Sequence, residues 1–247
     1  MDPLFDFHNK VALVTGGSRG LGQTMVMALA ERGADIIIAS RKSANCEKVA
    51  RDVQQLGRRA LAIPAHLGRW EQCDYLIESA YEEFGRIDIL INNAGMSPAC
   101  PSHEVTEKLF DSVLNLNFKG PFRLASQTAH RMARGNGGCI INISSTGALM
   151  ALPGVVPYGA AKAALNAMTV SLAAEYGPKV RVNGISAGPF MTQAHDDWDE
   201  ATIAKIKNPA GRPGQMPEIV TAMLMLASDA SAFTTGAILR VDGGQRG

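Results

Sequence analysis

Short runs of apolar, often β-branched residues alternate along this chain with longer segments of helical periodicity. Most of these runs are apolar almost throughout, which is typical of strands that helices cover on both faces. The predicted strands are Val11–Thr15, Asp35–Ala39, Ala60–Ile63, Ile87–Ile91, Cys139–Ser144, Val180–Ile185 and Ile238–Val241. Because such alternation requires crossover connections, the pattern predicts an α/β fold with a doubly wound, parallel, seven-stranded sheet and helices on both faces.

The segments between these strands place apolar residues three and four positions apart, as a helix packed on a sheet requires. The predicted helices are Leu21–Glu31, Ser43–Leu56, Trp70–Phe84, Thr106–Ala133 and Tyr158–Tyr176. No linker interrupts the alternation, so residues 1–247 are expected to form a single domain. Residues 188–214 depart from the pattern because they are rich in Gly, Pro and polar types. This stretch is expected to be a substrate lid or an irregular surface loop.

The overall charge is almost balanced, with 24 Lys and Arg against 23 Asp and Glu and a formal net charge of +1. This total gives no electrostatic footprint for nucleic acid or an anionic membrane, and no apolar run approaches the ~18 residues of a spanning helix. The four cysteines form no Cys-x-x-Cys pair and the five histidines no His-x-x-x-His pair. We therefore expect neither disulfides nor a metal site. Without a secretory signal, a cytoplasmic protein is expected.

A glycine-rich turn follows the first predicted strand and leads directly into a helix. It has the sequence Thr15-Gly16-Gly17-Ser18-Arg19-Gly20-Leu21-Gly22. Glycines at such a turn let the backbone approach a pyrophosphate, whose charge then lies at the helix N-terminus. The spacing of the glycines matches neither the G-x-G-x-x-G fingerprint nor a P-loop. The prediction of a nucleotide site therefore rests on the position of the turn between a strand and a helix. We expect a nucleotide to contact Gly16, Ser18, Arg19, Gly20, Leu21 and Gly22.

The residues after the second predicted strand indicate which dinucleotide is bound. An NAD site needs an acidic residue there for the ribose 2′-hydroxyl, whereas an NADP site needs a cation. The chain has Ser40-Arg41-Lys42 at this point and no carboxylate. Arg41 can form a bidentate pair with a 2′-phosphate, and Arg19 can approach it from the glycine turn. The sequence therefore favours NADP(H) over NAD(H); the alternative is that Arg41 and Lys42 are ordinary solvated charges.

Tyr158 and Lys162 are one helical turn apart near the start of a long predicted helix, so they share a face. Hydride transfer to or from a carbonyl needs a group that gives or takes a proton at the oxygen. A free phenol has a pKa of about 10, but an ammonium ~4 Å away contributes roughly 4 kcal/mol, or about three pKa units. We therefore expect Lys162 to lower the pKa of Tyr158 toward about 7, with desolvation offsetting part of the shift. Ser144 and Ser145 end the preceding strand, at the edge where such sheets bind ligands.

These pieces resemble the short-chain dehydrogenase/reductase family over essentially the full chain. Further matching pieces are Asn92-Asn93-Ala94-Gly95, Asn117, Gly188-Pro189 with Thr192, and Val241-Asp242-Gly243-Gly244. The resemblance implies a Rossmann-type fold, one dinucleotide-binding and catalytic domain, and interconversion of a ketone and a secondary alcohol.

The resemblance also implies roles for individual residues. Tyr158 is the general acid and base, and Lys162 lowers its pKa and binds the nicotinamide ribose. Ser145, with Ser144 as the alternative, holds the substrate oxygen. Asn117 holds a water of a proton relay; taken alone, it could be no more than a residue that kinks a helix. The remaining cofactor contacts that it implies are Asn93, Ala94 and Gly95 beside the adenosine ribose, and Ile185, Gly188 and Thr192 beside the nicotinamide.

The chain departs from the family pattern at two places. His66-Leu67 stands where the family usually has Asp-Val. The adenine contact of that Asp is therefore in doubt at His66, whereas a backbone contact at Leu67 can survive. Ala187-Gly188 stands where the family usually has Pro-Gly, which costs rigidity without removing a reacting group.

The substrate is less constrained than the cofactor. The overall resemblance is to 3-oxoacyl-carrier-protein reductases, whose acidic carrier needs cationic docking groups beside the cleft. Those enzymes tend to have an arginine where this chain has Asn136-Gly137-Gly138, and only Lys179, Arg131 and Arg134 could substitute in part. A free ketone, such as a cyclic ketone, a keto-sugar acid or a steroid, is the competing hypothesis. A dinucleotide-binding protein without activity is a third, against which Tyr158 and Lys162 argue.

Two further expectations concern the pocket and the assembly. Apolar residues flank the predicted site and suggest a mostly apolar pocket, or ordinary packing: Ala148, Leu149, Met150, Leu152, Val155, Phe190, Met191 and Trp198. The helices Thr106–Ala133 and Pro157–Tyr176 are apolar over more than one face, and the family pairs such helices in tetramers, which implies a homotetramer. The second face of the later helix is assigned to Ala161, Ala164, Leu165, Met168 and Leu172.

Overall fold

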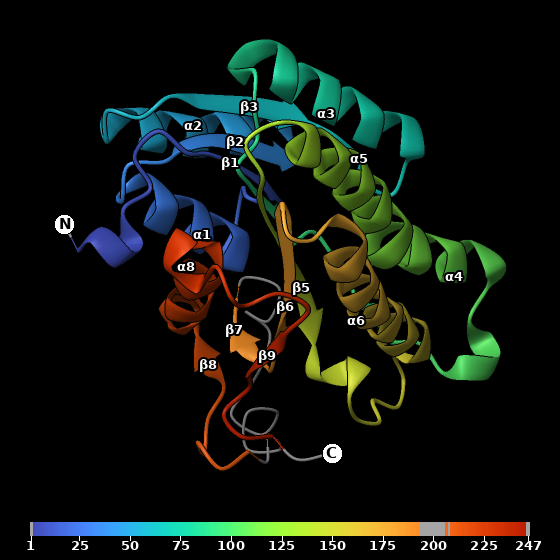
Figure 1. Cartoon of the computed structure of the whole chain (residues 1–247). Coiled ribbons are helices and arrows are strands. Elements are labelled where there is room, and N and C mark those ends of the chain that lie inside the picture. Colours follow the sequence, from blue (N-terminus) through green and yellow to red (C-terminus); the bar gives the residue numbers. More distant parts are fainter. Residues whose placement is uncertain (1, 193–205, 207, 246–247) are drawn as a thin grey trace.

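Seven parallel strands form a sheet at the centre of the molecule (Figure 1). The structure, a computed structural model, describes residues 2–192, 206 and 208–245. The strands are β1 (Val11–Thr15), β2 (Asp35–Ser40), β3 (Ala60–Pro64), β4 (Ile89–Asn92), β5 (Gly138–Ser145), β6 (Val180–Ala187) and β9 (Ile238–Val241). Their order across the sheet is β3-β2-β1-β4-β5-β6-β9, and every neighbouring pair is parallel. The predicted doubly wound sheet is confirmed.

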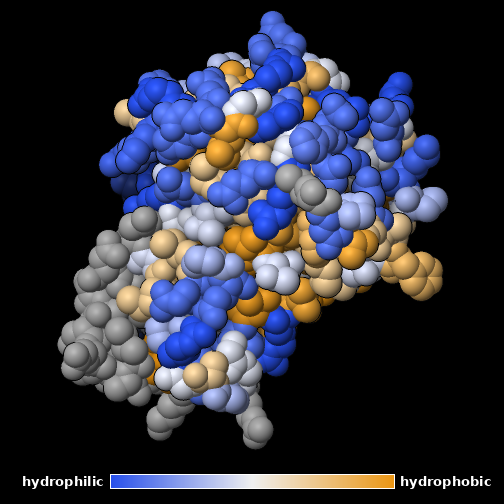
Figure 2. All heavy atoms as spheres, turned by 90° about the vertical axis from the view of Figure 1, so that its left-hand side faces the viewer, coloured by the Kyte–Doolittle hydropathy of each residue, from blue (hydrophilic) through white to orange (hydrophobic). Residues whose placement is uncertain are grey.

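Helices cover both faces of this sheet (Figure 1). They are α1 (Gly20–Ala30), α2 (Ser43–Gln55), α3 (Trp70–Phe84), α4 (Glu107–Leu114), α5 (Gly120–Arg134), α6 (Val156–Tyr176) and α8 (Val220–Ala227). Helices α1, α2 and α8 pack on one face, and α3, α5 and α6 pack on the other. Figure 2 shows the side that carries α1 and α8, where hydrophilic side chains dominate the upper part and hydrophobic atoms gather near the middle. No helix in the described part of the chain is long and apolar enough to cross a bilayer.

The predicted helix Thr106–Ala133 is present over residues 107–134, but a stretch in its middle is π-helical rather than α-helical. A π-helical turn at Asn115–Lys119 separates α4 from α5. Asn117 lies in this turn, completely buried, and its side chain donates a hydrogen bond to the carbonyl of Val113. Such turns are rare and are frequently found at functional sites. Helix α8 was not predicted, because its run of apolar residues has no amphipathic pattern to reveal it.

The second apolar face assigned to α6 is also wrong. Leu165, Met168 and Leu172 pack into the core between α6 and the sheet, and Ala161 is buried there as well. The face that α6 exposes consists of small and β-branched residues, among them Ala160, Ala163, Ala167 and Val170. A helix with such a face can approach another helix closely.

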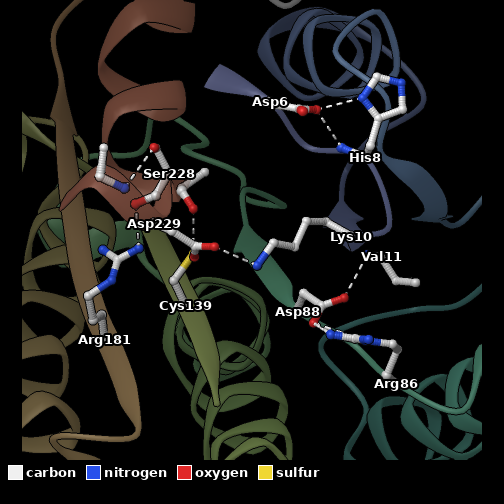
Figure 3. Close-up of polar contacts among 12 residues, drawn as sticks. Asp6, His8, Lys10, Val11, Arg86, Asp88, Cys139, Arg181, Ser228 and Asp229 are labelled. Atoms are coloured by element: carbon white, nitrogen blue, oxygen red, sulfur yellow. Dashed lines mark hydrogen bonds and ion pairs between the residues drawn. The ribbon is translucent and has the colours of Figure 1, made fainter. Parts of the chain in front are cut away.

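At the amino-terminal edge of the sheet, polar contacts involve residues near the start of β1, β4 and β6 and the segment that follows α8 (Figure 3). The buried carboxylate of Asp88 accepts a hydrogen bond from the backbone N–H of Val11 at 2.8 Å and pairs with Arg86. Lys10 forms an ion pair with Asp229 at 2.7 Å. Arg181 donates to the carbonyls of residues 226, 228 and 234. These contacts lie at the opposite end of the strands from the hollows described below.

Candidate active site

The turn between β1 and α1 requires glycine at several positions. Gly16 and Gly20 have φ angles of +63° and +55°, in the left-handed region that favours glycine. A Cβ at Gly22 would lie 2.2 Å from the carbonyl oxygen of Gly16, so a larger residue cannot fit. Helix α1 begins after Arg19 without a side-chain cap on its first N–H groups. Such an N-terminus can bind an anion.

A hollow of about 230 Å³ lies beside this turn, at the carboxyl edge of the sheet. Its lining residues come from the turn and from the segments that follow β2, β3 and β4. They are Gly16, Arg19, Gly20, Leu21, Gly22, Ser40, Arg41, Ala65, Leu67, Asn93, Ala94, Gly95, Leu116 and Thr192. All of them except Ala65 and Leu116 are residues predicted to contact the dinucleotide. The close backbone, the uncapped helix and the two arginines fit the phosphates of such a ligand.

Thr15, which the sequence analysis did not assign to the site, fixes the shape of this hollow. Its hydroxyl accepts hydrogen bonds from the backbone N–H groups of Asn93 and Ala94, at 2.9 and 3.1 Å. The side-chain amide of Asn93 donates in turn to the carbonyl of Thr15 at 2.9 Å. These bonds tie the end of β4 to the glycine turn. Thr15 is the last residue of β1, and polar residues at the carboxyl ends of parallel strands are candidates for a ligand site. This position in the sequence could have identified it.

Four residues expected to contact the cofactor line neither this hollow nor the cavity described next: Ser18, Lys42, His66 and Ile185, the last of which is completely buried. Ser18 is buried and interacts with the thiol of Cys46. Lys42 is exposed at the start of α2. His66 is exposed, and its Nδ1 accepts a hydrogen bond from the backbone N–H of Gly68 at 3.3 Å. The imidazole of His66 therefore forms a local hydrogen bond within its turn. The next residue, Leu67, lines the hollow.

A second cavity, of about 550 Å³, continues from the first. Arg19, Leu21, Asn93, Gly95 and Thr192 line both. The second cavity is completed by Met96, Ser97, Pro98, Ile143, Ser144, Ser145, Tyr158, Lys162, Ala187, Gly188 and Phe190. The structure thus brings three of the four predicted catalytic residues to one cavity that adjoins the glycine turn.

Strand β5 and helix α6 position these three side chains. The hydroxyl of Ser145 accepts a hydrogen bond from the backbone N–H of Gly147 at 3.1 Å and also interacts with Tyr158. The Nζ atom of Lys162 is buried, lies 5.7 Å from the centre of the Tyr158 ring, and donates to the carbonyl of Ile143 at 2.7 Å. Ser144 instead donates toward the carbonyl of Lys162, so Ser145 is the serine that faces the phenol.

The protonation of this pair differs from the expectation. Burial raises the pKa of Tyr158 above its ordinary value, and the hydrogen bond with Ser145 opposes this increase only in part. Burial also lowers the pKa of Lys162 from 10.5 to about 8. The expected decrease in the pKa of Tyr158 is therefore wrong for this structure, because burial dominates and the hydrogen bond with Ser145 opposes it only in part. At neutral pH Tyr158 is a neutral phenol that can donate a proton.

Asn117, the fourth predicted catalytic residue, lies behind the cavity. Its amide donates to the carbonyl of Met96 at 2.9 Å, and its Oδ1 accepts from the backbone N–H of Met96 at 3.3 Å. A Cβ at Gly95 would lie 2.7 Å from Oδ1 of Asn117 and 3.7 Å from Nζ of Lys162. Glycine at this position therefore lets the π-helical turn approach the lysine.

The C-terminal turn borders the cavity on the side of Gly188. The backbone N–H of Gly188 donates to the carbonyl of Val241 at 2.9 Å, and a Cβ at Gly188 would lie 2.7 Å from Cα of Asp242. The backbone N–H of Ala210 donates to the carbonyl of Gly243 at 3.0 Å. Nearby, β7 (Phe190–Met191) pairs with β8 (Gly214–Gln215). Trp198, expected in the substrate lid, lies outside the described residues.

Comparisons with known proteins agree with this geometry. A sequence profile of a family described as enoyl-(acyl carrier protein) reductase matches residues 16–246. The chain is 30% identical to a 3-oxoacyl-[acyl-carrier-protein] reductase of Thermotoga maritima, over 95% of this chain and 97% of that protein.

Two solved structures are also similar. One is a gluconate 5-dehydrogenase of Burkholderia cenocepacia in complex with NADP and tartrate, with 32% identity, a TM-score of 0.93 and coverage of 98% and 96% of the two chains. The other is a 7α-hydroxysteroid dehydrogenase in complex with NADH and 7-oxo glycochenodeoxycholic acid, with 29% identity, a TM-score of 0.94 and coverage of 99% and 97%.

Proposed function

Because the chain belongs to the short-chain dehydrogenase/reductase family, we propose that it interconverts a ketone and a secondary alcohol with NADP(H), using Tyr158 as general acid and base. One observation carries this proposal: Ser145, Tyr158 and Lys162 line a cavity that continues into the hollow of the glycine turn. A bound nicotinamide would supply or accept the hydride there. Similar proteins include a reductase of Thermotoga maritima and a dehydrogenase of Escherichia coli, which argues against a binding protein without chemistry.

In the direction of reduction, Tyr158 gives its proton to the carbonyl oxygen while the carbonyl carbon takes the hydride. The hydride that a bound dinucleotide would supply accounts for the two electrons by which the carbonyl is reduced. Ser145 donates a hydrogen bond that orients the same oxygen and stabilises the charge that develops on it. Lys162, held by the carbonyl of Ile143, lies where its positive charge stabilises the phenolate left behind. Asn117 would hold a water that returns a proton to this pair.

The preference for NADP(H) rests on Arg41 and Arg19, which both line the first hollow. The segment after β2 has no carboxylate that would repel a 2′-phosphate. An arginine can instead bind the phosphate through two parallel hydrogen bonds. Similar structures bind NADP in one case and NADH in another, so the preference is argued from these residues alone.

Reduction of a carrier-bound 3-oxoacyl group is the second candidate, and the positions of the basic residues weaken it. Arg134 precedes β5 and Lys179 precedes β6, so both lie at the amino-terminal edge of the sheet. Ser145 ends β5, about 23 Å away at ~3.3 Å per residue. Arg131 pairs with Glu78 instead of facing the cavity. These residues are poorly placed to guide an acidic carrier to Tyr158.

Replacement of Tyr158 by Phe tests the proposed reaction. The Tyr158→Phe variant should lose about 10²-fold or more in kcat with any ketone that the wild type reduces, because the proton donor is gone. The Kd for NADPH, measured by fluorescence titration, should change little. A variant with wild-type turnover would refute the mechanism.

A further inference from the structure

The part of the cavity beyond the reacting groups is almost free of charge. Among the described residues that line it, Arg19 and Lys162 alone carry basic or acidic side chains. Met96, Ser97 and Pro98 form one wall, which follows β4, and Phe190 of β7 lies in the wall next to Gly188. These side chains offer an apolar surface and a single hydroxyl to a substrate.

The segments that supply these walls are uncharged over long stretches. Residues 94–102, 139–161 and 183–194 contain no Asp, Glu, Lys or Arg. The loops 94–102 and 146–155 are joined by a hydrogen bond from the N–H of Cys100 to the carbonyl of Gly154 at 2.7 Å. On the second loop, and at the start of α6 that follows it, large apolar side chains reach the surface: Leu149 is 49% exposed and Val156 is 54% exposed.

Neither of the two basic side chains among the described lining residues is directed at the substrate part of the cavity. Lys162 is 4% exposed and directs its ammonium at the carbonyl of Ile143. A carboxylate close to this ammonium would favour its charged form, whereas burial alone acts on it and lowers its pKa. Arg19 lies in the glycine turn and lines the first hollow as well, where the dinucleotide phosphates belong.

We propose that the ketone on which this enzyme acts is uncharged and mainly apolar, and that the cavity selects against ketones that carry a carboxylate or phosphate. This inference rests on the proposed ketone reductase function and narrows its substrate class. The physical reason is that an anion moved from water into a cavity without a free cationic partner loses its hydration without compensation. An apolar ring or chain gains from the same transfer.

The test compares matched ketones that differ only in charge, for example 4-propylcyclohexanone and 3-(4-oxocyclohexyl)propanoate, together with smaller and larger pairs of the same design. NADPH and NADH oxidation is followed at neutral pH with the full-length protein. We expect kcat/KM to be at least about tenfold higher for the uncharged member of each pair. Equal or faster reduction of the anions would overturn the inference while leaving the reductase function intact. If neither member of any pair is reduced, the proposed function itself fails.

Ser97 allows a second test, since it lines the cavity and is exposed. In Ser97→Lys, the ratio of kcat/KM for the anionic ketone to that for its uncharged partner should rise by about tenfold or more, because the new ammonium compensates the carboxylate. In Ser97→Gln, which adds length without charge, the ratio should stay within about twofold of the wild-type value. The same ratio in both variants would contradict the inference.

Discussion

Lys162 follows Tyr158 by one helical turn, yet its ammonium is hydrogen-bonded to the carbonyl of Ile143 and lies 5.7 Å from the centre of the phenol ring. Burial raises the pKa of Tyr158 and lowers that of Lys162 to about 8, so at neutral pH the phenol keeps its proton and the ammonium keeps its charge. This protonation suits the reduction of a ketone, for which Tyr158 must begin with its proton.

The lowered pKa of Lys162 predicts a specific pH dependence of stability. Between about pH 8 and 10.5 the unfolded chain keeps this proton and the folded chain loses it, so stability rises with pH through this window. Relative to Lys162→Met, the wild type should gain up to about 1.4 kcal/mol of unfolding free energy per pH unit in this range. Urea unfolding of both proteins from neutral pH to pH 10 measures the difference. A difference that does not change with pH would contradict the burial of a charged lysine.

Arg41→Asp should reverse the cofactor preference. The change removes a cation from the hollow and introduces a carboxylate that repels a 2′-phosphate but can accept a hydrogen bond from a ribose hydroxyl. The ratio of kcat/KM for NADPH to that for NADH should fall by about tenfold or more. Lys48→Asp makes the same change of charge on the exposed surface of α2 and should leave the ratio unaltered. If both variants behave alike, Arg41 does not contact the phosphate.

Gly95→Ala should impair turnover by steric conflict. The added Cβ would lie 2.7 Å from Oδ1 of Asn117, which must move away together with the π-helical turn. We expect kcat to fall by about 10²-fold, since a small displacement of the groups around Lys162 is costly. Gly57→Ala is the control because no atom lies within 4 Å of its added Cβ. Its positive φ should cost about 1 kcal/mol of stability without loss of activity. Wild-type kcat in Gly95→Ala would show that the site tolerates the methyl group.

The exposed face of α6 supports the proposal of a homotetramer. Val170 on this face is 52% exposed, next to small residues that permit close helix packing. In Val170→Arg the mass measured by sedimentation equilibrium should be lower than in the wild type, because the proposed contact between subunits would bury a charge. Leu56→Arg, at a site that is 43% exposed at the end of α2, should sediment like the wild type. A monomeric wild type would refute the proposal.

Much of the sheet could be predicted, because each strand is a short apolar run bounded by polar residues. β1 and β9 have their predicted bounds, and the other strands differ by at most two residues at either end. The positions of Ser145 and Tyr158 follow from this topology, since both lie where elements meet the carboxyl edge of the sheet.

Features that depend on contacts between distant segments could not be predicted in this way. Asn117 in the π-helical turn donates a hydrogen bond to the carbonyl of Met96, which is 21 positions away in the sequence. The exposed imidazole of His66 is hydrogen-bonded within its own turn, to the N–H of Gly68. The pKa of Tyr158 depends on how far the phenol is buried, which the spacing to Lys162 does not reveal. The assignment of the inner face of α6 failed because apolar periodicity marks a buried face without saying what covers it.

The contact between Gly188 and the C-terminal turn has a consequence for the order in which the chain becomes active. The backbone at the cavity wall is completed only when residues Val241 and Asp242 reach it. Those residues follow Tyr158 by more than 80 positions, so the borders of the cavity come from distant parts of the sequence. The cavity wall is therefore completed by a long-range contact, and on refolding enzymatic competence should return only after β9 has joined the sheet.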